Sequence, residues 1–144
     1  MHSFQHWTGY ALIDTNAPPI LVAQKLFEAS FVLIAHGTES DPIFNYGNRK
    51  ALELWRLDWE AFTNLPSRCS AEPVEQKERE RMLAGAKNQG LIDNFQGIRI
   101  SSTGERFLIE DGIIWNVLDK EQRLCGQAAT FKRWTYQPDA TKLI

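Results

Sequence analysis

The amino-acid sequence predicts an α+β domain in which an antiparallel sheet packs against short helices. Two short apolar runs with β-branched and aromatic residues lie in the first third of the chain, and longer runs of this kind fill the last third. The stretch between them carries apolar residues at helical spacing. Strands and helices do not alternate as they do around a parallel sheet, so the order favours consecutive hairpins that frame a helical middle.

The first third supplies one helix and one hairpin. Pro18-Pro19 opens the helix, because proline is well placed in a first helical turn. The apolar run that follows is typical of a buried strand, and it stops at His36-Gly37 before turn residues lead into a second strand. The elements predicted for the whole chain are helices over residues 20–30, 49–57, 58–62 and 73–89, and strands over residues 31–35, 43–46, 95–101, 106–118 and 124–135.

Polar residues mark the helix boundaries in the middle of the chain. The side chains of Asn48 and Asp58 can each accept a hydrogen bond from a free amide of a first helical turn, which predicts that both are N-caps. The longest helix carries a charged run around Glu75 and Arg79, an i,i+4 pair, and ends at Gly90. We expect this charged run to mark a solvated face.

Turn residues divide the last third into three strands. Residues 102–105 and 119–123 predict the two hairpin turns, and Asp111-Gly112 is a natural position for a bulge in the long middle strand. The predicted organisation is an N-terminal helical lead-in over residues 1–18, one folded domain over residues 19–136 and a loose tail over residues 137–144.

The composition argues against several classes of function. Sixteen Lys and Arg face eighteen Asp and Glu, so the chain lacks the basic excess of a nucleic-acid binder. No apolar run is long enough to cross a bilayer, and the N-terminus carries no signal-peptide pattern. Two Cys do not make a disulfide framework and predict free thiols in a reducing cytoplasm. Five Trp among 144 residues predict a substantial aromatic core.

Three stretches of sequence resemble known families. The stretch IFNYGNRKALEL at residues 43–54 resembles the segment of PAS-type sensor domains in which a second strand runs into an Asn-capped helix. The stretch DWEAFTNLPSR at residues 58–68, followed by SAEP at residues 70–73, is similar to a narrower group, the MEKHLA domain. CGQAATF at residues 125–131, with WTY at residues 134–136, is similar to the C-terminal signature of that family.

The resemblance implies a PAS-like, five-stranded antiparallel sheet with short helices packed on one face. MEKHLA domains occur as stand-alone bacterial proteins and as C-terminal modules of class III homeodomain–leucine-zipper plant regulators, for which a sensory or interaction role is proposed. We therefore expect a non-catalytic sensory or protein-interaction module that binds a partner or a small apolar ligand, with ordering of the helical middle as the signal.

PAS folds bind ligands between the sheet and the helices, which leaves two interpretations of the aromatic residues. They line a pocket for a small apolar ligand, with Arg68 as a charged anchor for a carboxylate. Alternatively they fill a core without a cavity, and Arg68 pairs with Glu72. The candidate lining residues are Trp55, Trp59, Phe62, Leu65, Met82, Phe107, Trp115 and Phe131.

A flavin is the alternative ligand, for a sensor of light or redox state. Light-oxygen-voltage domains are PAS domains with a reactive Cys in the short helix after the first helical pair, and with Asn and Gln on the last strands. Resemblance to them implies roles for Cys69, Asn116 and Gln127 in binding the isoalloxazine ring. Haem is not expected, because the long helix over residues 73–89 has no His to hold it. No other cofactor and no metal site is expected.

A small α+β enzyme is a third class of function. The sequence carries no GxSxG elbow, GxGxxG turn or P-loop. His36 and Cys69 would form a nucleophile pair only if the fold brought them into contact with a third, orienting group. We therefore expect no catalytic residues.

The N-terminal lead-in carries the candidate interface. This segment is too apolar to be a solvated tail, because it contains Trp7, Tyr10, Leu12 and Ile13. They pack either on the sheet of the same chain or on a partner, and a contiguous exposed apolar patch would favour the partner. We expect a homodimer or a complex with a signalling protein.

Overall fold

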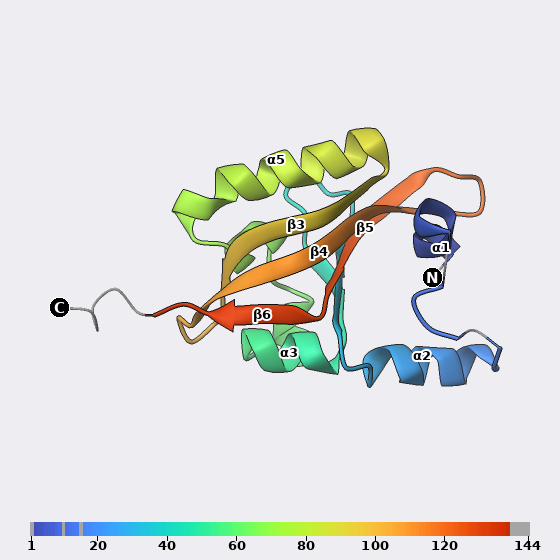
Figure 1. Ribbon diagram of the computed structural model, residues 1–144, viewed down its shortest axis with the longest axis horizontal. Coiled ribbons are helices and arrows are strands. Elements are labelled where there is room, and N and C mark those ends of the chain that lie inside the picture. The colour runs from blue at the N-terminus through green and yellow to red at the C-terminus, as the bar shows by residue number, and fades with distance from the viewer. Residues whose placement is uncertain (1, 10, 15, 139–144) are drawn as a thin grey trace.

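One antiparallel sheet organises the molecule, and the helices lie around it (Figure 1). The computed structural model describes residues 2–9, 11–14 and 16–138. The strands run in the order β2-β1-β5-β4-β3, and β6 pairs with β4. The strands are β1 (Val32–His36), β2 (Phe44–Gly47), β3 (Leu91–Ile100), β4 (Arg106–Leu118), β5 (Leu124–Phe131) and β6 (Arg133–Tyr136). The helices are α1 (His2–Thr8), α2 (Pro19–Phe27), α3 (Arg49–Trp55), α4 (Trp59–Phe62), the 3-10 helix η1 (Ser67–Ser70) and α5 (Pro73–Gln89).

Alternating side chains of the strands build a core on each face of the sheet. In β1, Val32 and Ile34 point into the core that the helical middle covers, whereas Leu33 and Ala35 belong to a second cluster on the opposite face. The strands are apolar on both faces because both faces are covered. This arrangement confirms the predicted α+β sheet with short helices packed on one face.

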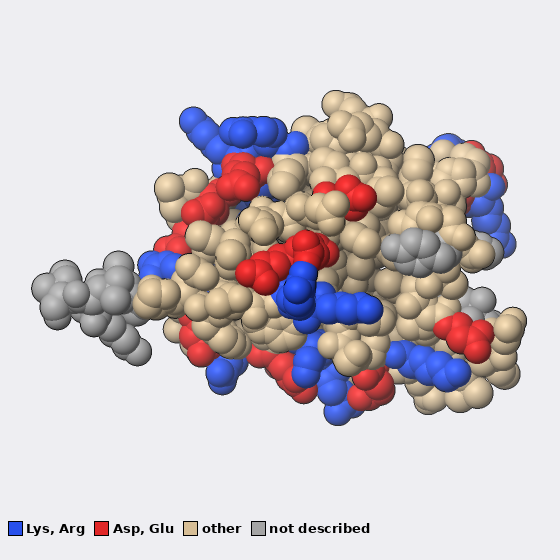
Figure 2. All heavy atoms as spheres, in the orientation of Figure 1, with Lys and Arg blue, Asp and Glu red and all other residues tan. Residues whose placement is uncertain are grey.

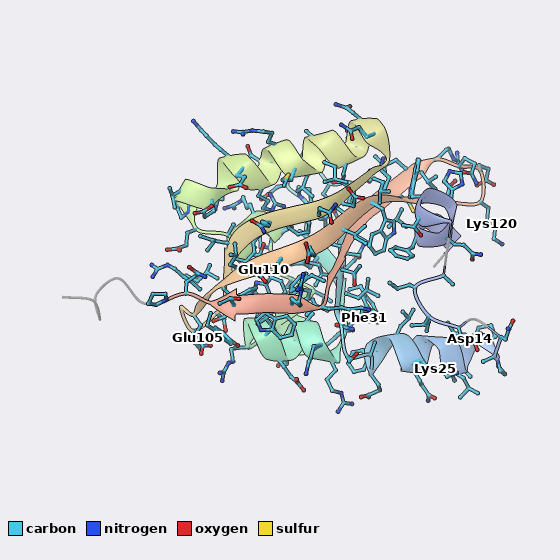
Figure 3. The ribbon with its side chains drawn as sticks, viewed as in Figure 1. Asp14, Lys25, Phe31, Glu105, Glu110 and Lys120 are labelled. Atoms are coloured by element: carbon cyan, nitrogen blue, oxygen red, sulfur yellow. The ribbon has the colours of Figure 1, made fainter. Side chains whose placement is uncertain are left out.

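The N-terminal lead-in covers the second face. Phe4 of α1 is buried and meets Trp115 edge to face, with the ring centroids 4.8 Å apart. The hydroxyl of Ser3 accepts a hydrogen bond of 2.8 Å from the amide of Leu118. Phe31 is buried where the chain enters the sheet, whereas Asp14 and Lys25 are exposed (Figure 3).

Two compensating bulges shape the β3–β4 hairpin. Asn94 on β3 and Asp111 on β4 have positive φ angles of 52° and 53°, and the strand register shifts beside each of them. The predicted bulge at Asp111-Gly112 is therefore confirmed. The bulge at Asn94 lets the strand begin at Leu91, earlier than predicted, because the polar residues there do not end the pairing.

Local sequence signals place most other boundaries. Asn48 and Asp58 accept hydrogen bonds from Ala51 (3.1 Å) and Ala61 (2.8 Å), as predicted for N-caps. The first predicted helix ends early, at Phe27, and the predicted final strand is divided into β5 and β6 around Lys132.

The surface carries charges of both signs. Basic and acidic side chains alternate over the face seen in Figure 2, without a large field of one sign. In the part of the chain that is described, no helix is both long and apolar enough to cross a membrane.

Candidate functional site

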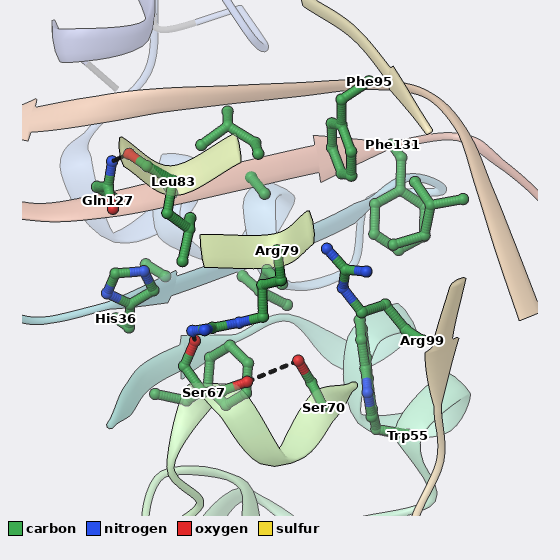
Figure 4. A pocket seen from close by; sticks show the side chains of 17 residues that line it. His36, Trp55, Ser67, Ser70, Arg79, Leu83, Phe95, Arg99, Gln127 and Phe131 are labelled. Carbon is green, nitrogen blue, oxygen red and sulfur yellow. Dashed lines mark hydrogen bonds between the residues drawn. The ribbon is translucent and has the colours of Figure 1, made fainter. Parts of the chain in front are cut away.

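A cavity of about 50 Å³ lies between the sheet and the helical middle (Figure 4). Its walls are mostly apolar, with side chains such as Phe95, Ile109 and Phe131. The volume is enough for roughly four water molecules. The polar residues that line it are His36, Ser67, Ser70, Arg79, Arg99 and Gln127.

Arg79 reaches the cavity from α5. Its side chain is only 6% exposed, and its Nη2 donates to the hydroxyl of Ser67 in η1. Burial lowers the pKa of the guanidinium, because desolvation disfavours its charge. The expectation that the charged run forms a solvated face is wrong at this position. Packing of α5 against β3 turns one side of the helix inward, and Arg79 and Ala86, two turns apart, both lie on that side.

Arg99 reaches the cavity from β3. It is 7% exposed, and its Nη1 donates to the carbonyl oxygen of Ile98 over 2.8 Å. Burial, and then the positive charge of Arg79, lower its pKa to about 10. Gly97 makes room for it, since a Cβ at that position would lie 2.8 Å from Nη1.

Within the described ranges, neither of these arginines forms an ion pair. The salt bridges there involve other arginines, such as Arg106 with Glu72 at 2.5 Å and Arg68 with Asp41 at 3.2 Å. A buried charge without a counter-ion costs several kcal/mol. Glu80 and Asp41 act on Arg79, and Glu78 and Glu75 on Arg99, only at longer range. The cavity therefore holds two buried guanidinium groups without a direct counter-ion in the described chain.

Two further buried polar atoms at the cavity lack hydrogen-bond partners in the described chain, Nε2 of His36 and Nε1 of Trp55. The Nδ1 atom of His36 lies 2.9 Å from the carbonyl oxygen of Gly37. A carbonyl can only accept, so Nδ1 carries the proton and Nε2 of the neutral ring is an acceptor. Burial lowers the pKa of His36 and favours this neutral form.

A hollow of about 480 Å³ on the surface adjoins the cavity between α5 and the β1–β2 loop. The two spaces share the lining residues His36, Arg79, Leu83 and Gln127. These four side chains therefore lie between the cavity and the surface hollow.

The aromatic candidates from the sequence are distributed over four environments. Trp115 lies on the opposite face of the sheet, in the second cluster. Trp55 lines the cavity, as Arg99 does (Figure 4). Phe62 and Phe107 are buried in the same core but do not line the cavity. Trp59 is 45% exposed and packs on Phe27 and Tyr46 at the surface.

The polar candidates are also separated. Gln127 lines the cavity, but its Nε2 donates to the Leu83 carbonyl (2.9 Å) and to Oδ1 of Asn116 (3.2 Å). The amide of Asn116 donates to the Lys87 carbonyl (3.1 Å), so both side chains tie the sheet to α5. Arg68 lies outside the cavity in its surface pair with Asp41, and the predicted pairing of Arg68 with Glu72 is wrong because Glu72 binds Arg106 instead. The thiol of Cys69 is exposed.

The candidate interface residues lie on the sheet of the same chain. Trp7, Leu12 and Ile13 are half-buried in the second cluster. The indole Nε1 of Trp7 donates to the carbonyl oxygen of Asn116 at 2.9 Å. Tyr10 lies outside the described residues.

Sequence reasoning missed His36, Arg79 and Arg99 as a group. One signal was present for Arg99, which stands between Ile98 and Ile100 in a strand and so faces away from them, towards the side of Phe95. Arg79 stands among other charged residues of α5, so the sequence pattern did not show that its side chain faces inward. In the described residues no group of three or more His, Cys, Asp or Glu side chains is placed to hold a metal ion.

The fold is similar to that of solved PAS domains. A PAS domain of a protein from Colwellia psychrerythraea is 11% identical with a TM-score of 0.67, covering 85% of this chain and 97% of that chain. An RNA-binding light-oxygen-voltage receptor is 17% identical with a TM-score of 0.68, covering 93% of this chain and 36% of that chain. A light-oxygen-voltage domain described with a flavin analogue is 12% identical with a TM-score of 0.63, covering 86% and 89%. These likenesses confirm the PAS-like fold.

The residues of this chain do not fit a flavin. A cavity of about 50 Å³ is far below the roughly 300–1,000 Å³ of pockets for larger ligands. The amides of Asn116 and Gln127 are engaged with α5 and with each other. Cys69 does not line the cavity.

The match to a protein family agrees with the fold, and the matched region includes the N-terminal lead-in. Comparison with the curated proteins gives no match. The family model described as the MEKHLA domain matches residues 1–136, which include α1 as well as the whole sheet. The chain therefore belongs to the MEKHLA domain family, and its fold is that of PAS domains.

Proposed function

We propose that this chain is a non-catalytic sensory module that binds a small ligand in the cavity between the sheet and the helical middle. One observation carries the proposal: an internal space is lined by apolar walls and by buried polar groups whose partners are missing from the described chain. Buried polar groups are normally satisfied, and a ligand or ordered water would satisfy these.

The helical middle is the element that would respond. The bond between Arg79 and Ser67 joins α5 to η1 directly across the cavity wall. A ligand that contacts this wall binds the ordered arrangement of the two helices better than a loosened one, and so shifts the population towards it. Ordering of the helical middle is the proposed signal.

The test compares ligand binding with and without the cavity. A panel of small acids, amides and alcohols of three to six non-hydrogen atoms is added to the protein, and thermal unfolding is followed. A ligand at a hundred times its Kd stabilises the folded state by about 2.7 kcal/mol, which raises the Tm. Ala129→Leu fills the cavity and is expected to remove the rise, whereas Ala23→Leu on the exposed side of α2 keeps it.

Folding of both variants is checked by circular dichroism, because overpacking costs about 1–3 kcal/mol. A panel that leaves the Tm of the unmodified protein unchanged contradicts the proposal. A folded Ala129→Leu variant that responds as strongly as the unmodified protein contradicts it as well.

A second copy of the chain is the proposed protein partner. The observation that favours it is α2, which buries none of its residues and leaves Ile20 and Leu21 exposed. Exposed apolar groups of this kind are typical of an interaction surface when they are contiguous. Trp7, Leu12 and Ile13 are already engaged with the sheet of their own chain, which makes α2 the better candidate.

A further inference from the structure

We infer that the ligand of this cavity is a small carboxylate that also carries a hydroxyl group, with Arg79 and Arg99 as its counter-ions. The inference rests on the proposed ligand-binding function and adds to it the chemical class of the ligand. It is argued from the charge of the cavity, from its size and from a buried acceptor at the cavity that lacks a partner in the described chain.

The charge of the cavity calls for an anion. Two guanidinium groups, 6% and 7% exposed, face one space, and no ion pair compensates Arg79 or Arg99 in the described chain. Each guanidinium has five N–H donors. The structure engages Arg79 with the hydroxyl of Ser67 and Arg99 with the carbonyl of Ile98. A neutral ligand would leave both groups without a direct counter-ion, whereas a carboxylate accepts charge-assisted hydrogen bonds from guanidinium groups.

The size and walls of the cavity favour a short carbon body. About 50 Å³ is enough for roughly four water molecules, which corresponds to an acid with one to three carbon atoms. Phe95, Ile109 and Phe131 offer apolar contacts to such a body. Trp55 adds a buried indole N–H without a partner in the described chain, a further donor suited to a carboxylate oxygen.

His36 adds the requirement for a donor on the ligand. Its Nε2 is a buried acceptor beside Arg79 at the edge of the cavity (Figure 4). A carboxylate oxygen cannot satisfy an acceptor, but a hydroxyl group donates to it. Glycolate, with two carbon atoms, has both groups and matches the size of the space.

The experiment measures the Kd of three probes by isothermal titration calorimetry: glycolate, acetate and the neutral amide acetamide. Glycolate is expected to bind most tightly, acetate more weakly and acetamide not detectably. Arg79→Met and Arg99→Met are each expected to weaken glycolate and acetate binding by about ten- to a hundredfold, the range for a lost hydrogen bond to a charged group. Arg123→Met, which removes an exposed arginine of the β4–β5 turn, is the matched control and binds as the unmodified protein does.

Stability of the ligand-free variants separates a binding role from a structural one. Replacing a buried charge that has no direct counter-ion by an apolar side chain is expected to leave the Tm equal or higher. A fall in Tm for both variants means that the arginines hold the fold together, and it contradicts the inference. His36→Phe is expected to abolish the preference for glycolate over acetate while acetate binding persists.

The outcomes distinguish the inference from the function on which it rests. If acetamide binds as tightly as acetate and this binding is lost in Ala129→Leu, the ligand is not a carboxylate. The ligand-binding function then still stands. Equal Kd values for glycolate and acetate overturn the hydroxyl requirement. If no probe of any class binds, the proposed function fails together with the inference.

Discussion

At the scale of single residues, Asn48 shows how one polar side chain organises a junction. It is fully buried, and its Oδ1 accepts from the amides of Ala51 and Leu33, both at 3.1 Å. Its Nδ2 donates to the carbonyl oxygens of Phe31 (2.8 Å) and Leu26 (3.1 Å). The side chain therefore caps α3 and also fixes the end of α2 and the start of β1, and all four of its hydrogen-bonding positions are used.

Asn48→Ala is expected to lower the free energy of unfolding by about 2–5 kcal/mol. The change removes a helix cap and leaves buried backbone groups without partners, each of which costs about 1–3 kcal/mol. Urea unfolding followed by tryptophan fluorescence measures the loss. Asp58→Ala, which removes an exposed cap, is the control and is expected to cost about 1 kcal/mol. Equal losses for the two variants would show that the additional bonds of Asn48 contribute nothing.

The arginines differ in whether they lie at the surface or at the cavity, and the residue type alone does not show which. Arg68, which the sequence offered as the carboxylate anchor, pairs with Asp41 at the surface. Arg79 and Arg99, which carried no motif, are the ones at the cavity. The same side chain is thus a solvated surface group or a buried cation according to the face on which the fold places it.

At the scale of elements, α2 stands apart from the other long helix. None of its residues is buried, and Ile20 and Leu21 are 70% and 44% exposed. It contacts the rest of the chain through partly buried side chains near its C-terminal end, such as Leu26 and Phe27. An exposed apolar helix of this kind adds little to the stability of the monomer.

Self-association through α2 is expected to be lost in the double variant Ile20→Asp with Leu21→Asp. The two substitutions place charges on the proposed contact, and their effect on stability is expected to be within about 0.5 kcal/mol for each exposed site. Size-exclusion chromatography with light scattering measures the mass. Gln24→Asp, an exposed substitution on the same helix, is the control. A monomeric unmodified protein at high concentration, or a dimeric double variant, contradicts the proposal.

At the scale of the whole molecule, two groups link stability to pH on the acid side. Burial lowers the pKa of His36 below 6.5, against the hydrogen bond to Gly37, with Arg79 lowering it further and Glu39 raising it. The unfolded chain then binds more protons below pH 6.5, so stability falls as the pH drops below that value. The Arg106 guanidinium lowers the pKa of Glu72 below 4.5, so its contribution is present above pH 4.5 and is lost as the pH falls through that region.

His36→Gln is expected to reduce the loss of stability just below pH 6.5 and to leave the loss below pH 4.5 unchanged. The variant no longer has a buried imidazole that must take up a proton, whereas Glu72 still loses its charge at lower pH. Glu72→Gln is expected to do the reverse. Urea midpoints measured from about pH 7 to about pH 3 separate the two windows, with His6→Gln as the matched control at an exposed histidine. If the urea midpoints of His36→Gln depend on pH as those of the unmodified protein do, His36 is not the group that lowers stability below pH 6.5.

The sequence by itself determined the order of the elements except for η1 and the separate strand β6. It also determined the caps at Asn48 and Asp58, the hairpin turns and the bulge at Asp111. These are local features, because caps and turns depend on side chains within a few residues of the backbone that they satisfy.

Only the tertiary structure decided which charged residues are buried and which face α1 covers. Arg79 faces inward because of the way α5 lies on β3. Strand alternation puts Arg99 on the side of Phe95, and packing of that side against α5 buries it. Both depend on contacts between segments far apart in the sequence, and a one-residue change of register would turn Arg99 to the other face.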